Sequence, residues 1–478
     1  MSFNSFQEFL RYLEEQGEVI RIAAEVSAEL EITEITDRVT KAQGKALLFE
    51  RVKGSRFPVV TNAFGSFKRV AMSLGRPPDE IARKIESLIT LKVPQGIADK
   101  VKLLPRLLEL AKIPPKMVSS APCQEVVHTE PDLSIIPALK CWPRDAGKFI
   151  TLPLVVTKSP EDGTRNIGMY RIQIYDKNTT GMHWQIHKDG RSHFSQYARA
   201  KKRMETAVVI GGDPATIYAA TAPLPPGIDE LLFAGFIRNR SVEIVRCKTI
   251  DLEVPAEAEF VIEGYLDPDE RRTEGPFGDH TGFYSPAEDY PVFHVTCITH
   301  RKNPVYPATV VGPPPMEDAF LAKATERIFL PLIRTVVPEL VDMNLPVEGA
   351  FHNCAIVSIS KSYPMQAQKV MHALWGMGQL MNTKMIIVVD GDVNVQDLSA
   401  VAWKAFNNVD PARDLTITSG PLDALDHSSP YPLHGSKVGV DATRKIEGET
   451  GRAWPEEIRM SEDIVRLVRD KWNEYGIP

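Results

Sequence analysis

The stretch Arg272–Gly282, which reads R-T-E-G-P-F-G-D-H-T-G, places two acids, Glu274 and Asp279, on either side of a Gly-Pro-Phe-Gly turn. Glycine adopts backbone angles that other residues avoid, and proline fixes its own, so the turn is stiff and sharply bent. Two carboxyl groups held at the ends of an apolar-centred turn suggest a site that handles protons. The alternative is an ordinary hairpin turn with two solvated acids, and this stretch alone supports both interpretations equally.

The region around the turn, from about Cys123 to Val311, is dense in strand-like apolar runs. Turn signals such as Gly211-Gly-Asp-Pro214 and Pro223-Leu-Pro-Pro-Gly227 separate these runs. Strands spaced so closely predict a β-barrel or sandwich with one helix near Ile228–Arg238. The predicted strands are Thr151–Val156, Ile167–Tyr175, Ala207–Ile210, Val242–Cys247, Ala258–Ile262 and Phe293–His300.

Before this region, strand and helix patterns alternate, which predicts an α/β N-terminal domain. Ser5 followed by Glu8 is a capping-box pattern that starts a helix over residues 5–16. Further helices are predicted over Ile32–Lys41 and Asp79–Leu91, and short strands over Ala46–Glu50 and Pro58–Thr61.

Alternation returns after Pro313-Pro-Pro315, so a second α/β domain is predicted there. Its predicted elements are helices over Glu317–Leu330, Ala367–Met381 and Gln396–Phe406 and strands over Cys354–Ser360 and Lys384–Asp390. A last helix, Ser461–Tyr475, is set apart, and we expect it either to dock on a neighbouring subunit or to pack on its own chain. The expected domains are residues 1–120, 121–312, 313–455 and the C-terminal helix in 456–478.

Length and composition describe an ordinary globular chain of 478 residues, with 43% apolar residues and a net charge of −6. This charge gives no basic footprint for nucleic acid. The five cysteines form no C-x-x-C pair, and free thiols fit a reducing cytoplasm. The N-terminus lacks a signal peptide, and no run approaches the ~18 apolar residues of a membrane span. We therefore expect a soluble cytoplasmic protein that is at most peripheral to the inner membrane.

Several common catalytic motifs are absent from the sequence. It contains no G-x-x-x-x-G-K-[ST], no H-E-x-x-H and no G-x-S-x-G. Gly376-Met-Gly378 lacks a third glycine and lies in a helical pattern, where helix packing explains it better. A nucleotide-using kinase or a serine hydrolase is therefore unsupported.

Polar residues in the β-rich region offer a candidate site. Asn166 and Arg171 lie five residues apart, on opposite faces of a regular strand, so they share a site only if the pleat breaks, for example at Gly168. Arg171 suits a bidentate grip on a carboxylate, and a structural ion pair is the alternative.

A histidine pair and a glutamate offer metal ligands. His183 and His187, four residues apart, share a face in a helix or a strand, although surface or core histidines are commoner. Glu230 opens a helix-like segment, where the helix dipole favours an anion. An Asn, a His and a Glu would form an oxygen-rich ligand set that suits Mn²⁺ or Mg²⁺. Sequence spacing alone does not bring them together.

The chain resembles the UbiD family of prenylated-FMN-dependent (de)carboxylases over essentially its full length. Glu274-Gly-Pro-Phe-Gly-Asp279 is the most specific match, and its combination with Asn166–Arg171 argues against coincidence. The tail Gly435–Thr443 resembles the quinone-biosynthesis branch, the 4-hydroxy-3-polyprenylbenzoate decarboxylases. The other matching segments are Leu30–Thr33, Ala46–Glu50, His183–Gly190, Pro225–Glu230 and Lys384–Val395. The resemblance implies a central FMN-binding split β-barrel flanked by α/β regions.

The resemblance also implies the site residues. Asn166, His187 and Glu230 would hold Mn²⁺ against the cofactor phosphate, with K⁺ as a further candidate ion. The cofactor-contacting positions carry over to Met169, Tyr170, Arg171, His183, Trp184, Gln185, Lys188, Asp189 and Lys384. The catalytic trio would be Arg171, Glu274 and Asp279, the last an aspartate where some members have a second glutamate.

In the chemistry that the resemblance implies, the substrate joins covalently to the modified flavin, which accepts electrons while CO₂ leaves. Arg171 would orient the substrate carboxylate and hold Glu274 ionised. Asp279 would then protonate the carbon left behind, and burial should raise the pKa of this acid so that it works near neutral pH.

The implied substrate is a small aromatic carboxylic acid, either a polyprenylated hydroxybenzoate of ubiquinone synthesis or a naphthoate of menaquinone synthesis. The implied partners are a flavin prenyltransferase that supplies the cofactor and further copies of the chain in a homodimer or homohexamer. Three alternatives stay open: a reversible (de)carboxylase of another aromatic or unsaturated acid, a non-catalytic flavin-binding protein and a mononuclear metal hydrolase.

Overall fold

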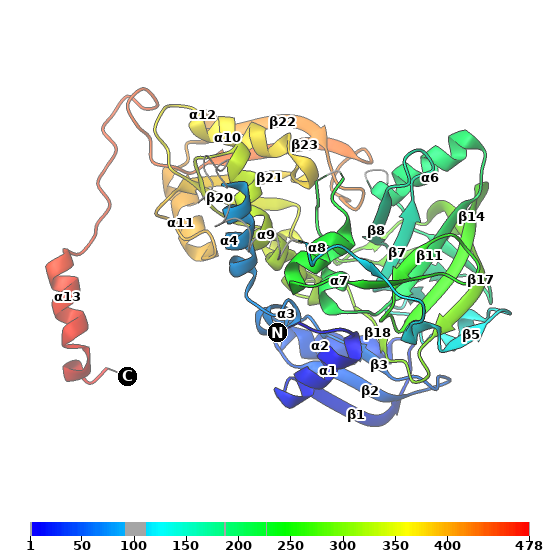
Figure 1. Ribbon diagram of the computed structural model, residues 1–478. Coiled ribbons are helices and arrows are strands. Elements are labelled where there is room, and N and C mark those ends of the chain that lie inside the picture. The colour runs from blue at the N-terminus through cyan, green and yellow to red at the C-terminus, as the bar shows by residue number, and fades with distance from the viewer. Residues whose placement is uncertain (1, 91–110, 186–187, 226, 478) are drawn as a thin grey trace, which may run out of the picture.

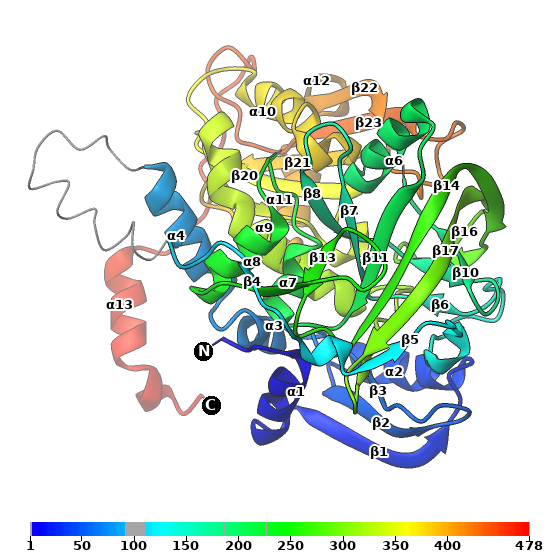
Figure 2. The same cartoon turned by 45° about the vertical axis from the view of Figure 1, so that its right-hand side comes forward.

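The protein is a mixed α/β chain whose computed structural model describes residues 2–90, 111–185, 188–225 and 227–477 (Figure 1). Within these ranges the strands form five sheets, and the predicted fold class is confirmed. The N-terminal sheet lies against one end of the central sheet, and the C-terminal α/β region lies at the other end (Figures 1 and 2).

The N-terminal sheet has the order β1-β2-β3-β18. Its last strand comes from the far end of the central region, so the two parts of the chain are interlocked. Ser5 caps α1 by accepting a hydrogen bond from Glu8 N, as the capping-box pattern predicts. The elements here are α1 (Phe6–Glu15), β1 (Val19–Val26), α2 (Glu31–Lys41), β2 (Ala46–Val52), β3 (Val59–Thr61), α3 (Phe67–Ser73), α4 (Pro78–Ile89) and β18 (Tyr306–Pro307).

Nine antiparallel strands form the central sheet, eight of them in the order β6-β9-β10-β17-β14-β11-β7-β8, with β5 on β17. In the described residues the end strands β6 and β8 do not pair, so the path stays open. The strands are β5 (Val126–His128), β6 (Phe149–Ile150), β7 (Pro153–Lys158), β8 (Arg165–Met169), β9 (Ile172–Ile174), β10 (Thr179–Met182), β11 (Met204–Ile210), β14 (Phe260–Glu274) and β17 (Glu288–His300). The helices of this region are α6 (Asp189–Ala200), α7 (Pro214–Ala219) and α8 (Glu230–Arg238).

Both faces of the central sheet are buried. Along β7, Leu154 and Val156 enter one apolar core, whereas Val155 between them enters another. The first core includes Ile217 of α7 and Phe233 of α8. Burial on both faces explains why these strands read as continuous apolar runs rather than as alternating patterns.

Two predicted strands differ from the structure. Ile167–Tyr175 is two strands, β8 and β9, because β8 pairs with β7 whereas β9 pairs with β10 and β6. Val242–Cys247 corresponds to β12, which lies in a separate sheet of order β13-β12-β4 rather than in the central sheet. The strands of that sheet are β4 (Lys116–Met117), β12 (Glu243–Arg246) and β13 (Glu253–Pro255).

The C-terminal sheet has the order β19-β20-β21-β23-β22, with a parallel centre. The predicted helix Ala367–Met381 is wrong in length, because α10 ends at Trp375 and Gly376 caps it. Gly378 has a φ of 46°, so a backbone turn explains this glycine better than helix packing. The elements are α9 (Glu317–Val336), β19 (Leu340–Asn344), β20 (Cys354–Ile359), α10 (Gln366–Trp375), β21 (Met385–Asp390), α11 (Leu398–Asn408), α12 (Pro411–Asp414), β22 (Leu415–Pro421) and β23 (His434–Asp441).

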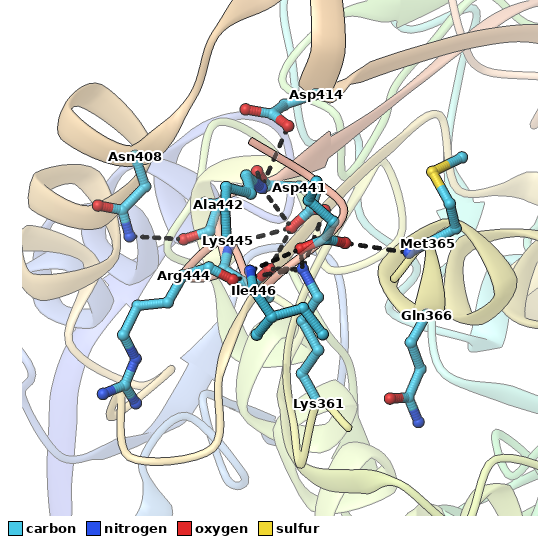
Figure 3. A network of polar contacts seen from close by, with 12 residues as sticks. Lys361, Met365, Gln366, Asn408, Asp414, Asp441, Ala442, Arg444, Lys445 and Ile446 are labelled. Atoms are coloured by element: carbon cyan, nitrogen blue, oxygen red, sulfur yellow. Dashed lines mark hydrogen bonds and ion pairs between the residues drawn. The ribbon is translucent and has the colours of Figure 1, made fainter. Parts of the chain in front are cut away.

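A buried network of ion pairs holds the segment that follows β23 (Figure 3). Lys445 Nζ lies 3.0 Å from Asp441 Oδ1 and 3.1 Å from Asp414 Oδ1, and all three side chains are buried. Lys361 Nζ donates a hydrogen bond to Glu449 Oε2 at 2.6 Å and lies 3.7 Å from Asp441 Oδ2. Buried charges of opposite sign compensate one another here, so the network fixes the path of the chain.

The C-terminal helix stands away from the body of the protein in both views (Figures 1 and 2). It comprises α13 (Glu462–Asp470) and a 3-10 turn, η5 (Trp472–Tyr475), and none of its residues is buried. The alternative that it packs on its own chain is therefore not observed. Among the described residues, no helix has both the length and the apolar character that crossing a membrane requires.

Candidate active site

Glu274 and Asp279 lie at the crown of the long β14–β17 hairpin. β14 ends at Glu274, which is paired with Glu288 at the start of β17. The loop between them contains a small ladder of β15 (Phe277–Gly278) and β16 (Tyr284–Ser285), and Asp279 directly follows β15. Glu274 is 0% and Asp279 8% exposed, so the alternative of a turn with two solvated acids is wrong.

Contacts to the backbone fix the shape of this loop. Asp145 accepts hydrogen bonds from Gly278 N at 2.8 Å and from the backbone N–H groups of residues 141 and 142. Gln173 accepts one from Gly275 N at 2.8 Å, and Gly275 has a φ of 88°, which favours glycine. A Cβ on Gly278 would lie 2.2 Å from Trp142 Cδ1. Both glycines of the turn are therefore required, one for its conformation and one for a close approach.

Arg171 lies between the two acids and binds both. Its Nε and Nη2 donate to Oε1 and Oε2 of Glu274 at 2.8 and 3.0 Å, and its Nη1 donates to Asp279 Oδ2. Nη2 also donates to Ser285 Oγ at 2.9 Å, and the guanidinium lies 4.8 Å from the centre of the Phe277 ring. The structure thus brings the three predicted catalytic residues together.

The chain changes strand partners just before Arg171, and this change directs the side chain to the acids. β8 ends at Met169 and β9 begins at Ile172. Asn166 and Arg171 are therefore not related by the alternation of a single strand. The pleat breaks after Met169 rather than at Gly168, which keeps its regular pairing with Val155.

The positive groups around the two acids hold both of them ionised. Burial acts to raise the pKa of Asp279, but the hydrogen bond from His280 and the charges of His280 and Arg171 outweigh it and hold the pKa well below its ordinary value. Burial likewise acts to raise the pKa of Glu274, and the hydrogen bonds from His183 and Arg171 bring it below its ordinary value. The prediction that burial raises the pKa of the proton-donating acid is therefore wrong for this arrangement.

His183 also contacts Glu274, at the carboxylate oxygen that Arg171 Nη2 binds. Its Nδ1 is 3.1 Å from Glu274 Oε2, and its ring lies 4.3 Å from that of Tyr290. Tyr290 and Ser285 were missed by the sequence analysis, although Ser285 lies only six residues beyond Asp279 in the same loop. Tyr290 gave no sequence signal, because only the β14–β17 pairing brings it to the site.

Two further histidines that the sequence analysis did not select continue the chain of polar contacts. His280 Nδ1 lies 2.9 Å from Asp279 Oδ1, and His280 Nε2 lies 2.9 Å from His352 Nε2. His280 was visible in the quoted stretch, directly after Asp279. His352 was not, because it comes from the segment before β20 in the C-terminal region.

The predicted metal ligands are brought together in part. Asn166 lies in β8, and the adjacent Ile167 N donates to Glu230 Oε2 at 3.0 Å. Burial raises the pKa of Glu230 to about 7, helped by the charges of Asp229 and Asp189. Among the described residues no group of three His, Cys, Asp or Glu side chains is arranged to hold a metal ion, and His187 lies outside those residues.

Two of the predicted cofactor-contacting residues, Tyr170 after β8 and Trp184 after β10, pack against each other. Tyr170 and Trp184 meet edge to face with ring centres 6.3 Å apart. Gly190, in the first turn of α6, lies so close that a Cβ there would be 2.8 Å from Trp184 Nε1. Trp184 Nε1 and Asn166 Nδ2 are buried and have no hydrogen-bond partner in the described part of the chain. Both N–H groups are therefore available to hydrogen-bond a ligand.

Three other predicted cofactor-contacting residues, Gln185, Lys188 and Lys384, do not share the surroundings of Tyr170 and Trp184. Gln185 and Lys188 flank residues 186–187, and burial lowers the pKa of Lys188. Lys384 precedes β21 in the C-terminal region, where its ammonium donates to Asp426 Oδ1 at 3.0 Å and Ser428 Oγ at 2.7 Å. The described contacts of Lys384 therefore connect it to the loop after β22 rather than to residues of the central sheet.

The fold and the site together define a mixed α/β protein in which a buried arginine is held between two carboxylates. Three family models match the chain, and they describe the N-terminal, Rift-related and C-terminal domains of 3-octaprenyl-4-hydroxybenzoate carboxy-lyase. They cover residues 10–89, 116–314 and 319–442 respectively. The chain belongs to the UbiD family of carboxy-lyases, which confirms both the family and the enzyme class predicted from the sequence.

Comparison with individual proteins agrees with this assignment. An uncharacterized protein of Archaeoglobus fulgidus is 53% identical, and the match covers 99% of each chain. The closed form of vanillic acid decarboxylase from Sedimentibacter hydroxybenzoicus is 28% identical, with a TM-score of 0.88 and 100% of both chains covered. An evolved dimeric form of the UbiD-class enzyme HmfF from Pelotomaculum thermopropionicum, in complex with prenylated FMN, is 30% identical, with a TM-score of 0.78 and 94% of this chain and 97% of that chain covered.

Proposed function

We propose that this chain is a prenylated-FMN-dependent decarboxylase of an aromatic carboxylic acid. The observation that carries the proposal is the buried Arg171–Glu274–Asp279 trio in a member of this family. Two similar structures support it by what they bind or act on, since one is a complex with prenylated FMN and another is a vanillic acid decarboxylase.

The residues around Asn166, Trp184 and Glu230 fit a cofactor that carries a phosphate, together with a hard cation. Two buried donors without partners, Asn166 Nδ2 and Trp184 Nε1, support a ligand there. We propose that Asn166, His187 and Glu230 hold Mn²⁺, because their oxygen-rich donor set suits this ion. The flavin would lie against the residues predicted from the resemblance: Met169, Tyr170, Arg171, His183, Trp184, Gln185, Lys188 and Asp189. When bound, it supplies the electron sink for the carbon that loses CO₂.

Arg171 donates most of its hydrogen bonds to Glu274 and Asp279. A guanidinium has five N–H donors, and Arg171 uses four of them on Glu274, Asp279 and Ser285. One N–H of Nη1 is left for a substrate carboxylate, so a bidentate grip on the substrate is not supported. Arg171 instead keeps both acids ionised and fixed, and Asp279 delivers a proton to the substrate carbon after CO₂ has left.

The test is turnover by the reconstituted enzyme. The protein, co-produced with a flavin prenyltransferase, is incubated with a panel of aromatic acids, and loss of CO₂ is followed by mass spectrometry. Glu274→Gln and Asp279→Asn should each lower turnover by about 100-fold or more while the flavin spectrum is kept. Full turnover by both variants would overturn the assigned roles. Activity without any flavin would favour a metal hydrolase, and bicarbonate-dependent product formation would favour a carboxylase.

The substrate class can be proposed more narrowly as a hydroxybenzoate. The family models carry the description of an enzyme of prenylated hydroxybenzoates, which favours a 4-hydroxy-3-polyprenylbenzoate of quinone biosynthesis. The vanillic acid decarboxylase supports an unprenylated acid as the second candidate. We compare kcat/KM for the prenylated and the unprenylated acid. A value for the prenylated acid that is more than about 10 times higher would identify it as the substrate, and a lower value would identify the unprenylated acid. All five cysteines are free, which supports a reducing, cytoplasmic location.

We also propose that the chain works as four parts, residues 1–120, 121–312, 313–455 and 456–478, and that the last part docks on a second copy. Ile464, Val465, Leu467 and Trp472 of this part are all at least 38% exposed. An apolar face without a partner indicates an interface. Deletion of residues 461–478 should shift the mass measured by light scattering toward the monomer. An unchanged oligomer would show that α13 is not needed for assembly.

A further inference from the structure

His280 is the only described side chain that joins the proposed proton donor to the C-terminal region through direct hydrogen bonds on both of its ring nitrogens. Its Nδ1 lies 2.9 Å from Asp279 Oδ1, and its Nε2 lies 2.9 Å from His352 Nε2. Phe351 stacks on the imidazole with ring centres 5.2 Å apart. The ring is therefore fixed by an acid on one side, a histidine on the other and an aromatic face.

The hydrogen bonds determine where protons must lie. Asp279 Oδ1 is a carboxylate oxygen, so His280 Nδ1 must carry the hydrogen that it donates. Between the two Nε2 atoms there is room for one hydrogen only, and His280 or His352 supplies it. In either case His280 Nδ1–H points at Asp279, and a proton is stored beside the acid.

The charges around His280 favour its imidazolium form. Burial acts to lower the pKa of His280, but Asp279, Asp318 of α9 and Asp423 after β22 raise it above the ordinary value. Burial lowers the pKa of His352 to about 4, and the charges of His280 and Lys188 lower it further. The charges of Asp423 and Asp279 act in the opposite direction and raise this pKa. His352 is thus neutral and can accept a hydrogen bond from a protonated His280.

This arrangement answers a question that the trio alone leaves open. Arg171 and His280 hold Asp279 ionised, yet a carboxylate without a proton cannot protonate carbon. The nearest stored proton is the one on His280 Nδ1. Transfer of this proton to Asp279 breaks the Nδ1–H bond, forms an Oδ1–H bond and leaves a neutral His280 that keeps its Nε2–H toward His352. Asp279 then gives the proton to the electron pair on the substrate carbon, and it is a carboxylate again.

We propose that His280 is the positioning residue that supplies the proton which Asp279 delivers, and that His352 holds it in place from the C-terminal region. The relay rests on the proposed function, because it requires Asp279 to protonate the substrate. It is assembled only where the loop after β15 meets the segment before β20, so it depends on contact between these two parts of the chain.

The first test does not depend on turnover. Histidine labelled with ¹³C and ¹⁵N is followed by NMR through a pH titration, and His280→Asn identifies the signal of His280. In the wild-type chain His280 should stay protonated above the ordinary histidine pKa of about 6.5. Asp279→Asn should shift its titration to lower pH. Titration of wild-type His280 at or below the ordinary value would overturn the relay.

The second test uses the holoenzyme and a hydroxybenzoic acid that it decarboxylates. Asparagine keeps a hydrogen-bond donor near the position of Nδ1 but carries no transferable proton, so His280→Asn should lower kcat by about 100-fold with little change in KM. The decrease of kcat at alkaline pH that the wild-type enzyme shows should be absent from this variant. His352→Phe should shift that decrease to lower pH. His294→Asn is the matched control, since His294 of β17 also contacts an acid, with its Nε2 2.6 Å from Oε2 of Glu270 on β14. This variant should keep wild-type turnover.

The two tests separate failure of the relay from failure of the proposed function. If Asp279→Asn loses turnover while His280→Asn keeps the wild-type kcat and pH profile, the relay is wrong and the function stands. If no acid is decarboxylated, or if Asp279→Asn is fully active, the proposed function fails. The NMR titration then still decides whether the stored proton exists.

Discussion

Arg171 presents its bidentate edge to Glu274, with Nε and Nη2 donating to the two carboxylate oxygens at 2.8 and 3.0 Å. A lysine cannot reproduce this contact, because an ammonium is a point charge without a planar fork. Arg171→Lys should keep the net charge of the site but let Glu274 and Asp279 move. Misplacement of about 1 Å costs on the order of 100-fold in rate, so turnover of the best aromatic acid should fall by about that factor.

A matched control for this change lies in the C-terminal region. Arg413 also donates through Nε and Nη2 to one carboxylate, that of Asp414, at 2.8 and 2.7 Å. Arg413→Lys should leave turnover unchanged. Equal loss in both variants would mean that arginine is needed for folding rather than for the chemistry.

Glu230 should decide how much metal the protein retains. Glu230→Gln keeps an oxygen that can accept from Ile167 N, whereas it removes the negative charge that a divalent cation needs. Changes even outside the ligand shell cost about 10–100-fold in metal affinity. Manganese retained after dialysis, measured by mass spectrometry, should therefore fall at least about tenfold.

Glu263→Gln is the control for this measurement. Glu263 is a buried acid that accepts hydrogen bonds from the backbone N–H groups of residues 248 and 249. Its substitution should leave the manganese content unchanged. Retention of metal by Glu230→Gln at the wild-type level would remove Glu230 from the ligand set.

The sequence predicted the fold well where local signals are strong. Capped amphipathic helices such as α1, and apolar runs such as those of β7 and β11, agree with the structure to within a few residues. Errors arose where pairing overrides local pattern. The polar half of β14, which includes Arg271 and Arg272, is a strand because it pairs with β17, and no periodicity indicates it. The break after Met169 depends in the same way on a change of strand partner.

The site was predictable only as far as its residues are close in sequence or match a family motif. Arg171, Glu274 and Asp279 were selected in this way, and the structure brings them into contact. The charge state of Asp279 was not predictable, because it depends on His280 and Arg171 as much as on burial. His352 was not predictable either, since 72 residues separate it from its partner His280.

Glu317 should make the stability of the protein fall with rising pH. Burial raises the pKa of this acid to about 7, while its Oε1 accepts a hydrogen bond from Phe64 N at 2.7 Å. A raised folded-state pKa stabilises the fold fully below the unfolded pKa of about 4.3, and this contribution is lost as the pH rises through about 7. Glu317→Gln keeps the acceptor and removes the ionisation. Urea unfolding measured at pH values from about 5 to about 8 should therefore show a smaller decrease in the free energy of unfolding for this variant than for the wild-type chain.

The buried ions around Lys445 give a prediction about stability alone. Lys445→Met leaves Asp414 and Asp441 buried without their common partner. Breaking a buried ion pair in this way costs about 3–5 kcal/mol in the free energy of unfolding. Arg38→Ala, which removes the exposed Arg38–Glu34 pair, should cost less than about 1 kcal/mol. Similar losses in the two variants would show that burial does not decide the strength of these pairs.

The last prediction concerns Gly278, the second glycine of the turn that holds the acids. Its Cα hydrogen faces the indole of Trp142, which is fixed by a hydrogen bond from Nε1 to Val311 O at 2.9 Å. Gly278→Ala must therefore push the loop away from Trp142, at a cost of about 1–3 kcal/mol, and Asp279 moves with the loop. Turnover should fall more than the melting temperature suggests, since the displaced residue is the proton donor. Gly451→Ala is the control, because a Cβ at Gly451 meets nothing within 4 Å and should change neither quantity. If Gly278→Ala lowers the melting temperature but leaves turnover intact, the position of Asp279 is less critical to the chemistry than the geometry of the trio indicates.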